Sequence, residues 1–203
     1  MDIYGYDESF RVQVQGIVAG LDEAGRGPIA GPVVAAAVVL PSHLRIDGIR
    51  DSKKLTERQR RSLFYDILCL ASDIGVGISE VETIDRVNIL ESTRLAMALA
   101  VRDLHTEPRM LLIDAVVLPE VGIRQTSPYK GESLSASIAA ASIVAKVVRD
   151  GIMDHYHELY PEYGFDRHKG YSTRFHLEAL RAHGPCPIHR RSFGEVLSPL
   201  LPF

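Results

Sequence analysis

Apolar and polar residues follow one another along the chain in a pattern that predicts strands first and then helices interleaved with strands. A turn-free stretch over residues 12–21 and an apolar run over residues 33–40 predict two strands on either side of a loop rich in glycine and proline. Alternating apolar positions predict a third strand over residues 74–81. The short apolar run at 110–113 predicts a further strand that ends on Asp114.

Helical spacing of apolar residues marks four other segments. A Thr-x-x-Gln capping box starts a predicted helix over residues 56–71, and a second helix is predicted over residues 89–104. A long helix follows Gly131, and a last one over residues 172–182 ends at a Gly-Pro pair. This order of elements predicts an α/β fold with a mixed central sheet flanked by helices and a helical C-terminal part.

The composition fits a single domain over residues 1–203. The chain has 203 residues, 46% of them hydrophobic, and a mean hydropathy of +0.02, which suffices for one sizeable core. The longest apolar run is strand-sized and no basic residues lead into an apolar N-terminal segment, so we expect a soluble, cytoplasmic protein. The two cysteines, Cys69 and Cys186, lie far apart in sequence, which fits a reducing compartment.

Charge is distributed unevenly along the chain. The net charge is −3, yet residues 166–191 carry six Lys or Arg against two Asp or Glu, so this segment is +4 and the remainder is −7. Four of the eight histidines also fall in it. A basic patch on an acidic protein can hold a phosphate backbone while the acidic part holds metal ions, although a solvated surface explains the charges alone equally well.

Three carboxylates are predicted to stand at the ends of buried strands. Asp22 and Glu23 follow the first strand, and Asp114 follows the run at 110–113. Burying neighbouring carboxylates is costly unless a cation compensates, and if these strands are neighbours the carboxylates converge at one edge of the sheet. Oxygen ligands favour Mg²⁺ or Mn²⁺, which suit phosphodiester cleavage. Taken singly, each aspartate is more often a cap of a loop or helix.

Three further segments carry candidate substrate contacts. The Gly-Arg-Gly at 25–27 offers backbone N–H groups and a guanidinium that can recognise a ribose hydroxyl and its phosphate, although such a tripeptide alone is usually a turn. Lys53 lies just before the capped helix, where phosphates bind favourably. Tyr171, in the basic segment, either stacks on a sugar or base or fills the core.

Other chemistries have weaker patterns. His183, Cys186 and His189 are spaced three apart, but zinc sites usually have four ligands and Cys69 is the only other thiol. The sequence contains no Gly-x-x-x-x-Gly-Lys phosphate loop and no Gly-x-Ser-x-Gly elbow, so nucleoside triphosphatases and serine hydrolases have no motif here.

In combination, these motifs resemble those of the bacterial ribonuclease HII family. The resemblance covers about residues 15–196, in the family's order, and leaves residues 197–203 as a C-terminal tail. The segments that carry it are Gly20-Leu21-Asp22-Glu23-Ala24-Gly25-Arg26-Gly27-Pro28, Asp51-Ser52-Lys53-Lys54-Leu55, Leu112-Ile113-Asp114, Ala140-Ala141-Ser142-Ile143-Val144-Ala145-Lys146, His168-Lys169-Gly170-Tyr171 and Arg190-Arg191-Ser192-Phe193-Gly194.

The resemblance implies a ribonuclease H-like fold and an endonuclease that hydrolyses the RNA strand of RNA–DNA hybrids, including single ribonucleotides embedded in duplex DNA. It implies two-metal-ion catalysis with Mn²⁺ or Mg²⁺ and a cut 5′ to the ribonucleotide that leaves a 3′-hydroxyl and a 5′-phosphate. It further implies a role in removing misincorporated ribonucleotides and RNA primers.

Site residues follow from the resemblance by position. The metal-binding carboxylates are Asp22, Glu23 and Asp114. The residues implied to contact the ribonucleotide are Gly25, Arg26 and Gly27, which recognise its 2′-hydroxyl, and Tyr171, which packs on the sugar at the RNA–DNA junction. Weaker candidates for backbone contacts are Lys53, Lys146 and Arg191.

One position departs from the family's pattern. The family usually has a fourth carboxylate, an Asp in a Lys-Gly-Asp-Ser motif, where this chain has Glu132. We expect this longer side chain to bind metal less securely, and therefore to slow turnover or change the preference between Mg²⁺ and Mn²⁺.

Two alternatives stand beside this hypothesis. A non-catalytic protein that binds RNA–DNA hybrids on the same fold would require a broken carboxylate set, and a relative of ribonuclease HIII would require an extra N-terminal domain, for which this chain has no room. We expect a monomer without a membrane partner. Contact with a sliding clamp through the apolar tail 197–203 is less expected than a tail folded back on the domain.

Overall fold

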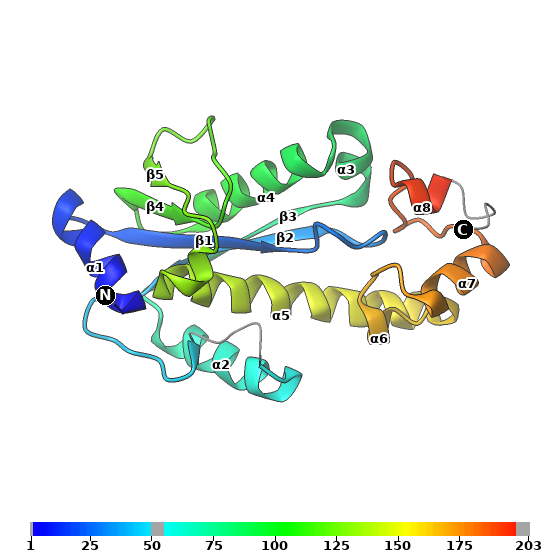
Figure 1. Ribbon diagram of the computed structural model, residues 1–203, viewed down its shortest axis with the longest axis horizontal. Coiled ribbons are helices and arrows are strands. Elements are labelled where there is room, and N and C mark those ends of the chain that lie inside the picture. The colour runs from blue at the N-terminus through cyan, green and yellow to red at the C-terminus, as the bar shows by residue number, and fades with distance from the viewer. Residues whose placement is uncertain (1, 50–54, 198–203) are drawn as a thin grey trace.

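The computed structural model describes residues 2–49 and 55–197, and these contain a five-stranded sheet (Figure 1). The strands are β1 (Val18–Ala24), β2 (Val33–Val39), β3 (Asp73–Ser79), β4 (Met110–Ile113) and β5 (Arg124–Thr126). They lie in the order β3-β2-β1-β4-β5. Because β1 pairs antiparallel with β2 and parallel with β4, the sheet is mixed, as the sequence predicts.

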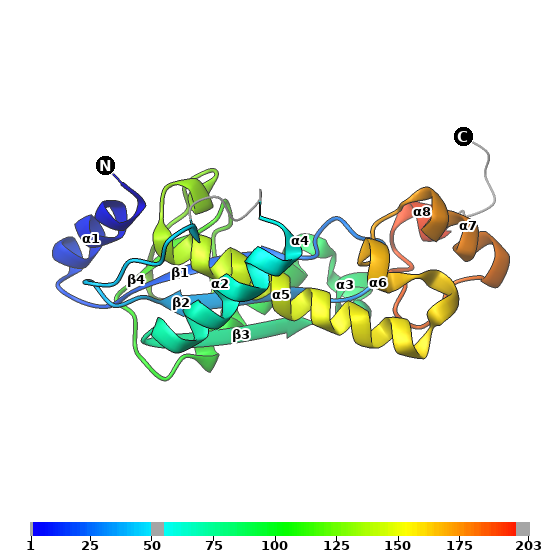
Figure 2. The same cartoon turned by 90° about the horizontal axis from the view of Figure 1, so that it is seen from below.

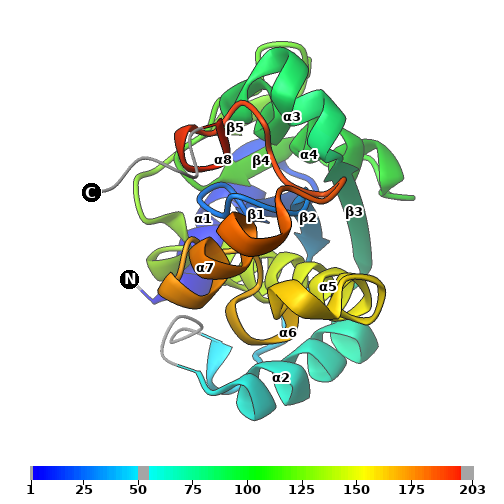
Figure 3. The ribbon, with the colours of Figure 1, turned by 90° about the vertical axis from the view of Figure 1, so that its right-hand side faces the viewer.

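Helices cover both faces of the sheet (Figures 2 and 3). They are α2 (Glu57–Leu70), α3 (Val81–Val87), α4 (Ile89–Asp103) and α5 (Ala136–Leu159). Along β2, Ala36 and Val38 pack with α5, whereas Ala35 and Ala37 pack with α4 on the opposite face. Both faces of β2 are therefore buried, which is why its sequence is continuously apolar.

Glycines let these helices approach the strands closely. A Cβ at Gly20 of β1 would lie 2.1 Å from the backbone carbonyl carbon of Ser137 in α5. A Cβ at Gly77 of β3 would lie 2.0 Å from the backbone oxygen of Ala96 in α4. Any side chain at either glycine would push a helix away from the sheet, and at Gly20 that helix lies against the strand that carries Asp22.

Further helices lie at the two ends of this layered body (Figure 1). They are α1 (Ile3–Val14) at one end and α6 (Phe165–His168), α7 (Arg174–His183) and α8 (Gly194–Leu197) at the other. Asp7 of α1 is buried and accepts hydrogen bonds from the backbone N–H (2.8 Å) and the hydroxyl (2.7 Å) of Ser137, which fastens α1 to the start of α5. None of the described helices is both long and apolar enough to cross a membrane.

Most of the predicted elements are confirmed, and both boundaries of the first predicted strand are wrong. The predicted strands at 33–40 and 110–113 and the helices at 56–71 and 89–104 match β2, β4, α2 and α4 within about two residues. The predicted strand over 12–21 instead runs over Val18–Ala24, because residues 12–14 belong to α1 and the pairing with β2 continues to Ala24. Asp22 and Glu23 therefore lie within the strand and not after it. Tyr6, Phe10 and Val14 recur every four residues and pack together on one helix face, and Gln15 then ends the helix with a left-handed backbone (φ 48°). The helix α1 and the short elements α3, α6, α8 and β5 have no counterpart among the predicted elements.

Candidate active site

The strand pairing brings two of the predicted carboxylates to neighbouring positions. Leu21 of β1 pairs with Ile113 of β4 in parallel register, and the next residues along the two strands are Asp22 and Asp114. The backbone N–H of Asp114 donates to the carbonyl of Leu21 at 3.1 Å, which extends the pairing by one step. The two strands are therefore neighbours, which is the condition under which the sequence predicts that these carboxylates converge.

Asp22 and Glu23 are carboxylates in a poorly hydrated, negatively charged environment. Asp22 is only 6% exposed, and burial, followed by the charges of Glu23 and Asp114, raises the pKa of its carboxyl well above the usual value. Burial also raises the pKa of Glu23, an effect that Arg26 opposes through an ion pair of 3.2 Å to Oε1. Glu23 Oε2 is buried and has no hydrogen-bond partner among the described residues.

These carboxylates fit a divalent cation by the chemistry of their donors. A bound cation would offset both the desolvation and the mutual repulsion of Asp22, Glu23 and Asp114, and Glu23 Oε2 is a buried oxygen available as a ligand. Within residues 2–49 and 55–197, no three His, Cys, Asp or Glu side chains already meet as a compact metal cluster. Like charges in a low-dielectric site repel one another, so we expect cation binding to draw them together.

Glu132 lies in a segment that is built against Asp114. It sits in the short 3₁₀ helix Gly131–Ser133 and is only 5% exposed. The backbone N–H of Gly131 donates to Asp114 Oδ1 at 2.6 Å, and a Cβ at Gly131 would lie 3.3 Å from the same oxygen. A side chain at residue 131 would crowd this oxygen, so glycine favours the contact. Glu132 is the next residue along the chain. The role of Glu132 as a fourth metal ligand stays a prediction.

A buried guanidinium organises the loop that follows Glu23. Arg190 is fully buried, and its three nitrogens donate to five backbone carbonyls. The acceptors are the oxygens of Gly25 (2.5 Å), Arg26 (3.0 Å), Pro28 (2.6 Å), Gly31 (2.8 and 2.9 Å) and Pro32 (3.3 Å). Burial, together with the nearby charge of Arg149, lowers the pKa of Arg190 to about 9, so the side chain still carries its charge at neutral pH.

Arg149 of α5 supports the same loop through further hydrogen bonds. It is 1% exposed and donates to the carbonyls of Pro32 (3.0 Å), Ala30 (3.1 Å) and Lys169 (3.0 Å). Gly25 has a φ of +98°, and a Cβ there would lie 2.1 Å from Nε of Arg149. Glycine is therefore required at residue 25 both by the backbone conformation and by the approach of this guanidinium.

The carbonyls that bind Arg190 determine where the N–H groups of the Gly-Arg-Gly segment point. In a trans peptide the C=O of one residue and the N–H of the next point in opposite directions, and the described chain has no cis peptide. Because the carbonyls of Gly25 and Arg26 face Arg190, the N–H groups of Arg26 and Gly27 face away from it. Neither N–H donates to another described residue, so both can bind a ligand.

A cavity of about 400 Å³ collects most of the predicted substrate-binding residues. Its lining consists of Glu23, Ala24, Gly25, Arg26, Gly27, Arg60, Ser142, Ile143, Lys146, Arg149 and Tyr171. Tyr171 is 47% exposed, and its Cε1 lies 3.6 Å from where a Cβ of Gly27 would stand. The ring is thus presented beside the loop rather than packed in the core.

One predicted contact residue, Arg191, does not line this cavity. Arg191 is exposed and its backbone N–H donates to Asp85 (3.0 Å), while its neighbour Arg190 has the buried position. Lys53 lies outside the described residues. Sequence reasoning missed Arg149, although it lies four residues after Ala145 and four before Met153, both of them buried positions of α5. An arginine on an apolar helical stripe is the pattern that could have revealed it.

A chain of hydrogen bonds holds the backbone of Tyr171. The backbone carbonyl of Tyr171 can only accept, so the His176 Nδ1 that contacts it at 2.9 Å carries a proton. His176 Nε2 is then an acceptor for His189 Nε2–H at 3.0 Å, and His189 Nδ1 accepts from the backbone N–H of Cys186 at 3.0 Å. Each bond has one donor and one acceptor only while both imidazoles are neutral.

Comparison with known proteins assigns this arrangement to a family. A family model of ribonuclease HII matches residues 19–196. The chain belongs to the ribonuclease HII family. It is 54% identical to the ribonuclease HII of Syntrophobacter fumaroxidans over 196 residues, which cover 97% of this chain and 84% of that protein.

Solved structures of the ribonuclease HII family share the fold. The ribonuclease H2 from Pyrococcus horikoshii OT3 has a TM-score of 0.77 at 29% identity, covering 90% of this chain and 96% of the other. The ribonuclease HII of Archaeoglobus fulgidus, in a complex with PCNA, has a TM-score of 0.73 at 28% identity, covering 86% and 93%. The predicted ribonuclease H-like fold is thus confirmed, and the protein is a ribonuclease H, an endoribonuclease of a family that depends on divalent metals.

Proposed function

We propose that this enzyme cuts the RNA strand of RNA–DNA hybrids, and duplex DNA at single embedded ribonucleotides, on the 5′ side of the ribonucleotide. The products are a 3′-hydroxyl and a 5′-phosphate. The observation that carries the proposal is one cavity that joins a carboxylate with a buried oxygen, Glu23, to the backbone donors of the Gly-Arg-Gly segment. Membership of the ribonuclease HII family supports it.

Asp22, Glu23 and Asp114, with Glu132 beside them, would hold the divalent ions. Such ions, Mg²⁺ or Mn²⁺, supply an activated water and neutralise charge on the leaving oxygen. The N–H groups of Arg26 and Gly27 bind the 2′-hydroxyl and the adjoining phosphate, which positions the ribonucleotide. A deoxynucleotide lacks the hydroxyl that these donors require, so the same contacts supply selectivity.

Tyr171 packs on the sugar that follows the ribonucleotide. Its half-exposed ring lies beside Gly27 in the cavity lining. The Arg26 guanidinium, now paired with Glu23, can bind a phosphate oxygen instead. In the cell this activity serves the removal of misincorporated ribonucleotides and RNA primers. The enzyme acts as a monomer in this proposal, and a clamp contact would involve residues 197–203, nearly all of which lie outside the described residues.

Cleavage of an end-labelled DNA duplex with one ribonucleotide tests the proposal. With Mg²⁺ or Mn²⁺ we expect a single cut 5′ to the ribonucleotide. The upstream product should end in a 3′-hydroxyl, which extension by a DNA polymerase detects. An all-DNA duplex and a reaction with chelator are the controls. Cutting of the all-DNA duplex, or a cut on the 3′ side, would contradict the proposal.

A further inference from the structure

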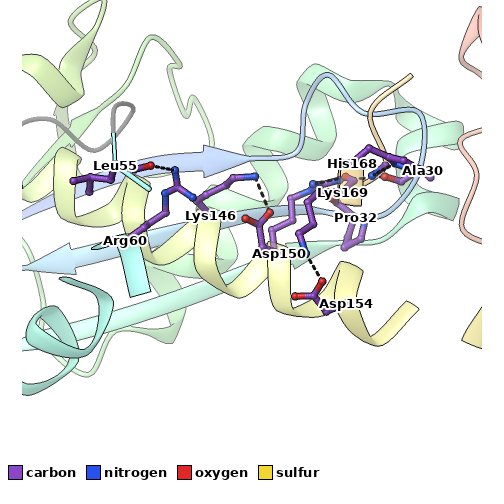
Figure 4. A network of polar contacts seen from close by, with 11 residues as sticks. Ala30, Pro32, Leu55, Arg60, Lys146, Asp150, Asp154, His168 and Lys169 are labelled. Carbon is purple, nitrogen blue, oxygen red and sulfur yellow. Dashed lines mark hydrogen bonds and ion pairs between the residues drawn. The ribbon is translucent and has the colours of Figure 1, made fainter. Parts of the chain in front are cut away.

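The cavity beside the Gly-Arg-Gly segment is also lined by two cationic side chains from other parts of the chain. Arg60 of α2 and Lys146 of α5 line the same cavity as Glu23 and Gly27, and Figure 4 shows the two side chains next to each other. They come from different helices, and α2 lies alongside α5 in Figure 2. The fold therefore brings together two positive charges that are far apart in sequence.

The lining of the cavity has an excess of positive charge. It contains four cationic side chains and, among the described residues, a single carboxylate. That carboxylate, Glu23, is already paired with Arg26, and Lys146 is paired with Asp150 at 2.7 Å. Arg60 and Arg149 bind only backbone carbonyls of the described chain. A cavity with this balance attracts an anion.

Arg60 is held in a way that leaves donors for a ligand. One terminal nitrogen donates to the carbonyl of Leu55 at 3.0 Å (Figure 4). A guanidinium has five N–H donors, so one such bond orients the group and leaves the others available. Lys146 is about one-third exposed in its ion pair, so its ammonium can turn from Asp150 to a stronger anion.

We propose that Arg60 and Lys146 form a phosphate subsite for the strand that carries the ribonucleotide. The inference rests on the proposed function, since the nucleotide bound by Arg26 and Gly27 fixes where that strand enters. A backbone that passes through one continuous cavity places a flanking phosphate of the same strand at its cationic end. The subsite contributes affinity and register, and it does not read sequence.

Binding of a duplex with one ribonucleotide, measured in chelator at several salt concentrations, tests the subsite. Arg60→Gln should weaken binding about tenfold, the effect of one lost charge-assisted contact, and lower the slope of log affinity against log salt by about one. Arg61→Gln is the matched control, because Arg61 is exposed, neighbours Arg60 on α2 and does not line the cavity. Arg60→Lys should retain the slope, and thermal melting checks that each variant is folded.

Neutral methylphosphonates, introduced one at a time, identify the strand. At one phosphate beside the ribonucleotide, on its own strand, the substitution should weaken binding of the wild type about tenfold and leave Arg60→Gln unaffected. Coupling only on the complementary strand, or equal salt slopes for Arg60→Gln and Arg61→Gln, would overturn the assignment. Wild-type cleavage of the same duplex with metal separates the two proposals: cleavage without coupling contradicts the subsite alone, and coupling without cleavage contradicts the proposed function alone.

Discussion

Acid should lower the free energy of unfolding of this protein through the two buried histidines that are hydrogen-bonded to each other and to the backbone of Tyr171. His176 and His189 are each at most 1% exposed, and burial lowers the pKa of both to about 4 from an ordinary value of 6.5. A proton added to His176 makes its Nε2 a donor facing the Nε2–H of His189, and a proton added to His189 makes its Nδ1 a donor facing the backbone N–H of Cys186. The unfolded chain accepts these protons near pH 6.5, whereas the folded chain resists them until about pH 4.

The magnitude follows from the two pKa values. Between pH 6.5 and 4 the unfolded state binds more protons, so the free energy of unfolding falls with falling pH by about 1.4 kcal/mol per pH unit for each histidine. Over the whole window each histidine accounts for about 3 kcal/mol, a large part of the 5–15 kcal/mol typical of a folded domain. Asp22 acts in the opposite direction because its folded-state pKa is raised, so the test compares variants rather than absolute stabilities.

Urea unfolding at pH 7.5, 6.5, 5.5 and 4.5 measures this effect. A His176→Asn variant keeps a donor for Tyr171 but cannot take up the extra proton, so its loss of stability between pH 6.5 and 4.5 should be smaller than that of the wild type by about 2 kcal/mol. His43→Asn, at an exposed position, is the matched control and should follow the wild type. If His176→Asn and the wild type lose stability in parallel, the histidine pair does not have the proposed effect.

Three substitutions test other parts of the structure. Arg190→Lys cannot reach five carbonyls at once, so it should lower the free energy of unfolding by about 2–5 kcal/mol in urea melts and reduce cleavage at single ribonucleotides; unchanged cleavage would show that the loop does not need this guanidinium. Gly20→Ala should cost about 1–3 kcal/mol because its Cβ meets the backbone of α5, whereas Gly151→Ala, exposed within α5 and free of contacts, should gain up to about 1 kcal/mol; equal effects would refute the packing argument. Glu132→Asp should raise turnover or change the ratio of rates in Mg²⁺ and Mn²⁺, and an unaltered rate and ratio would remove Glu132 from the metal site.

Local sequence patterns predicted the strands and helices that position the carboxylates. Met110–Ile113 is fully apolar and buried on both faces, so its boundaries and the placement of Asp114 follow from the pattern alone. The capping box at Thr56 is formed as predicted, with reciprocal hydrogen bonds to Gln59. In α1, by contrast, polar residues interrupt the four-residue spacing of the apolar ones, so the sequence pattern places the apolar residues at its end in the next strand.

Contacts between distant segments explain what sequence could not provide. Arg190 lies 165 positions after Gly25, whose carbonyl it binds, and nothing in the local pattern distinguishes it from Arg191. Arg60 was overlooked for a similar reason, since α2 has three arginines within four residues and only the packing of α2 beside α5 shows which of them lines the cavity. The direction of the Arg26 and Gly27 N–H groups likewise depends on partners far along the chain.

The central claim is that Asp22, Glu23 and Asp114 hold the ions that cleave the strand. Its most direct test compares Asp22→Asn with the wild type, using Mg²⁺ cleavage of a duplex with one ribonucleotide and, in the same preparation, binding of that duplex in chelator. We predict that cleavage is abolished while binding stays within about twofold, because the amide keeps the shape of the side chain but lacks the charge that a cation requires. Near-normal cleavage by Asp22→Asn in Mg²⁺ would contradict the assignment of the metal ligands.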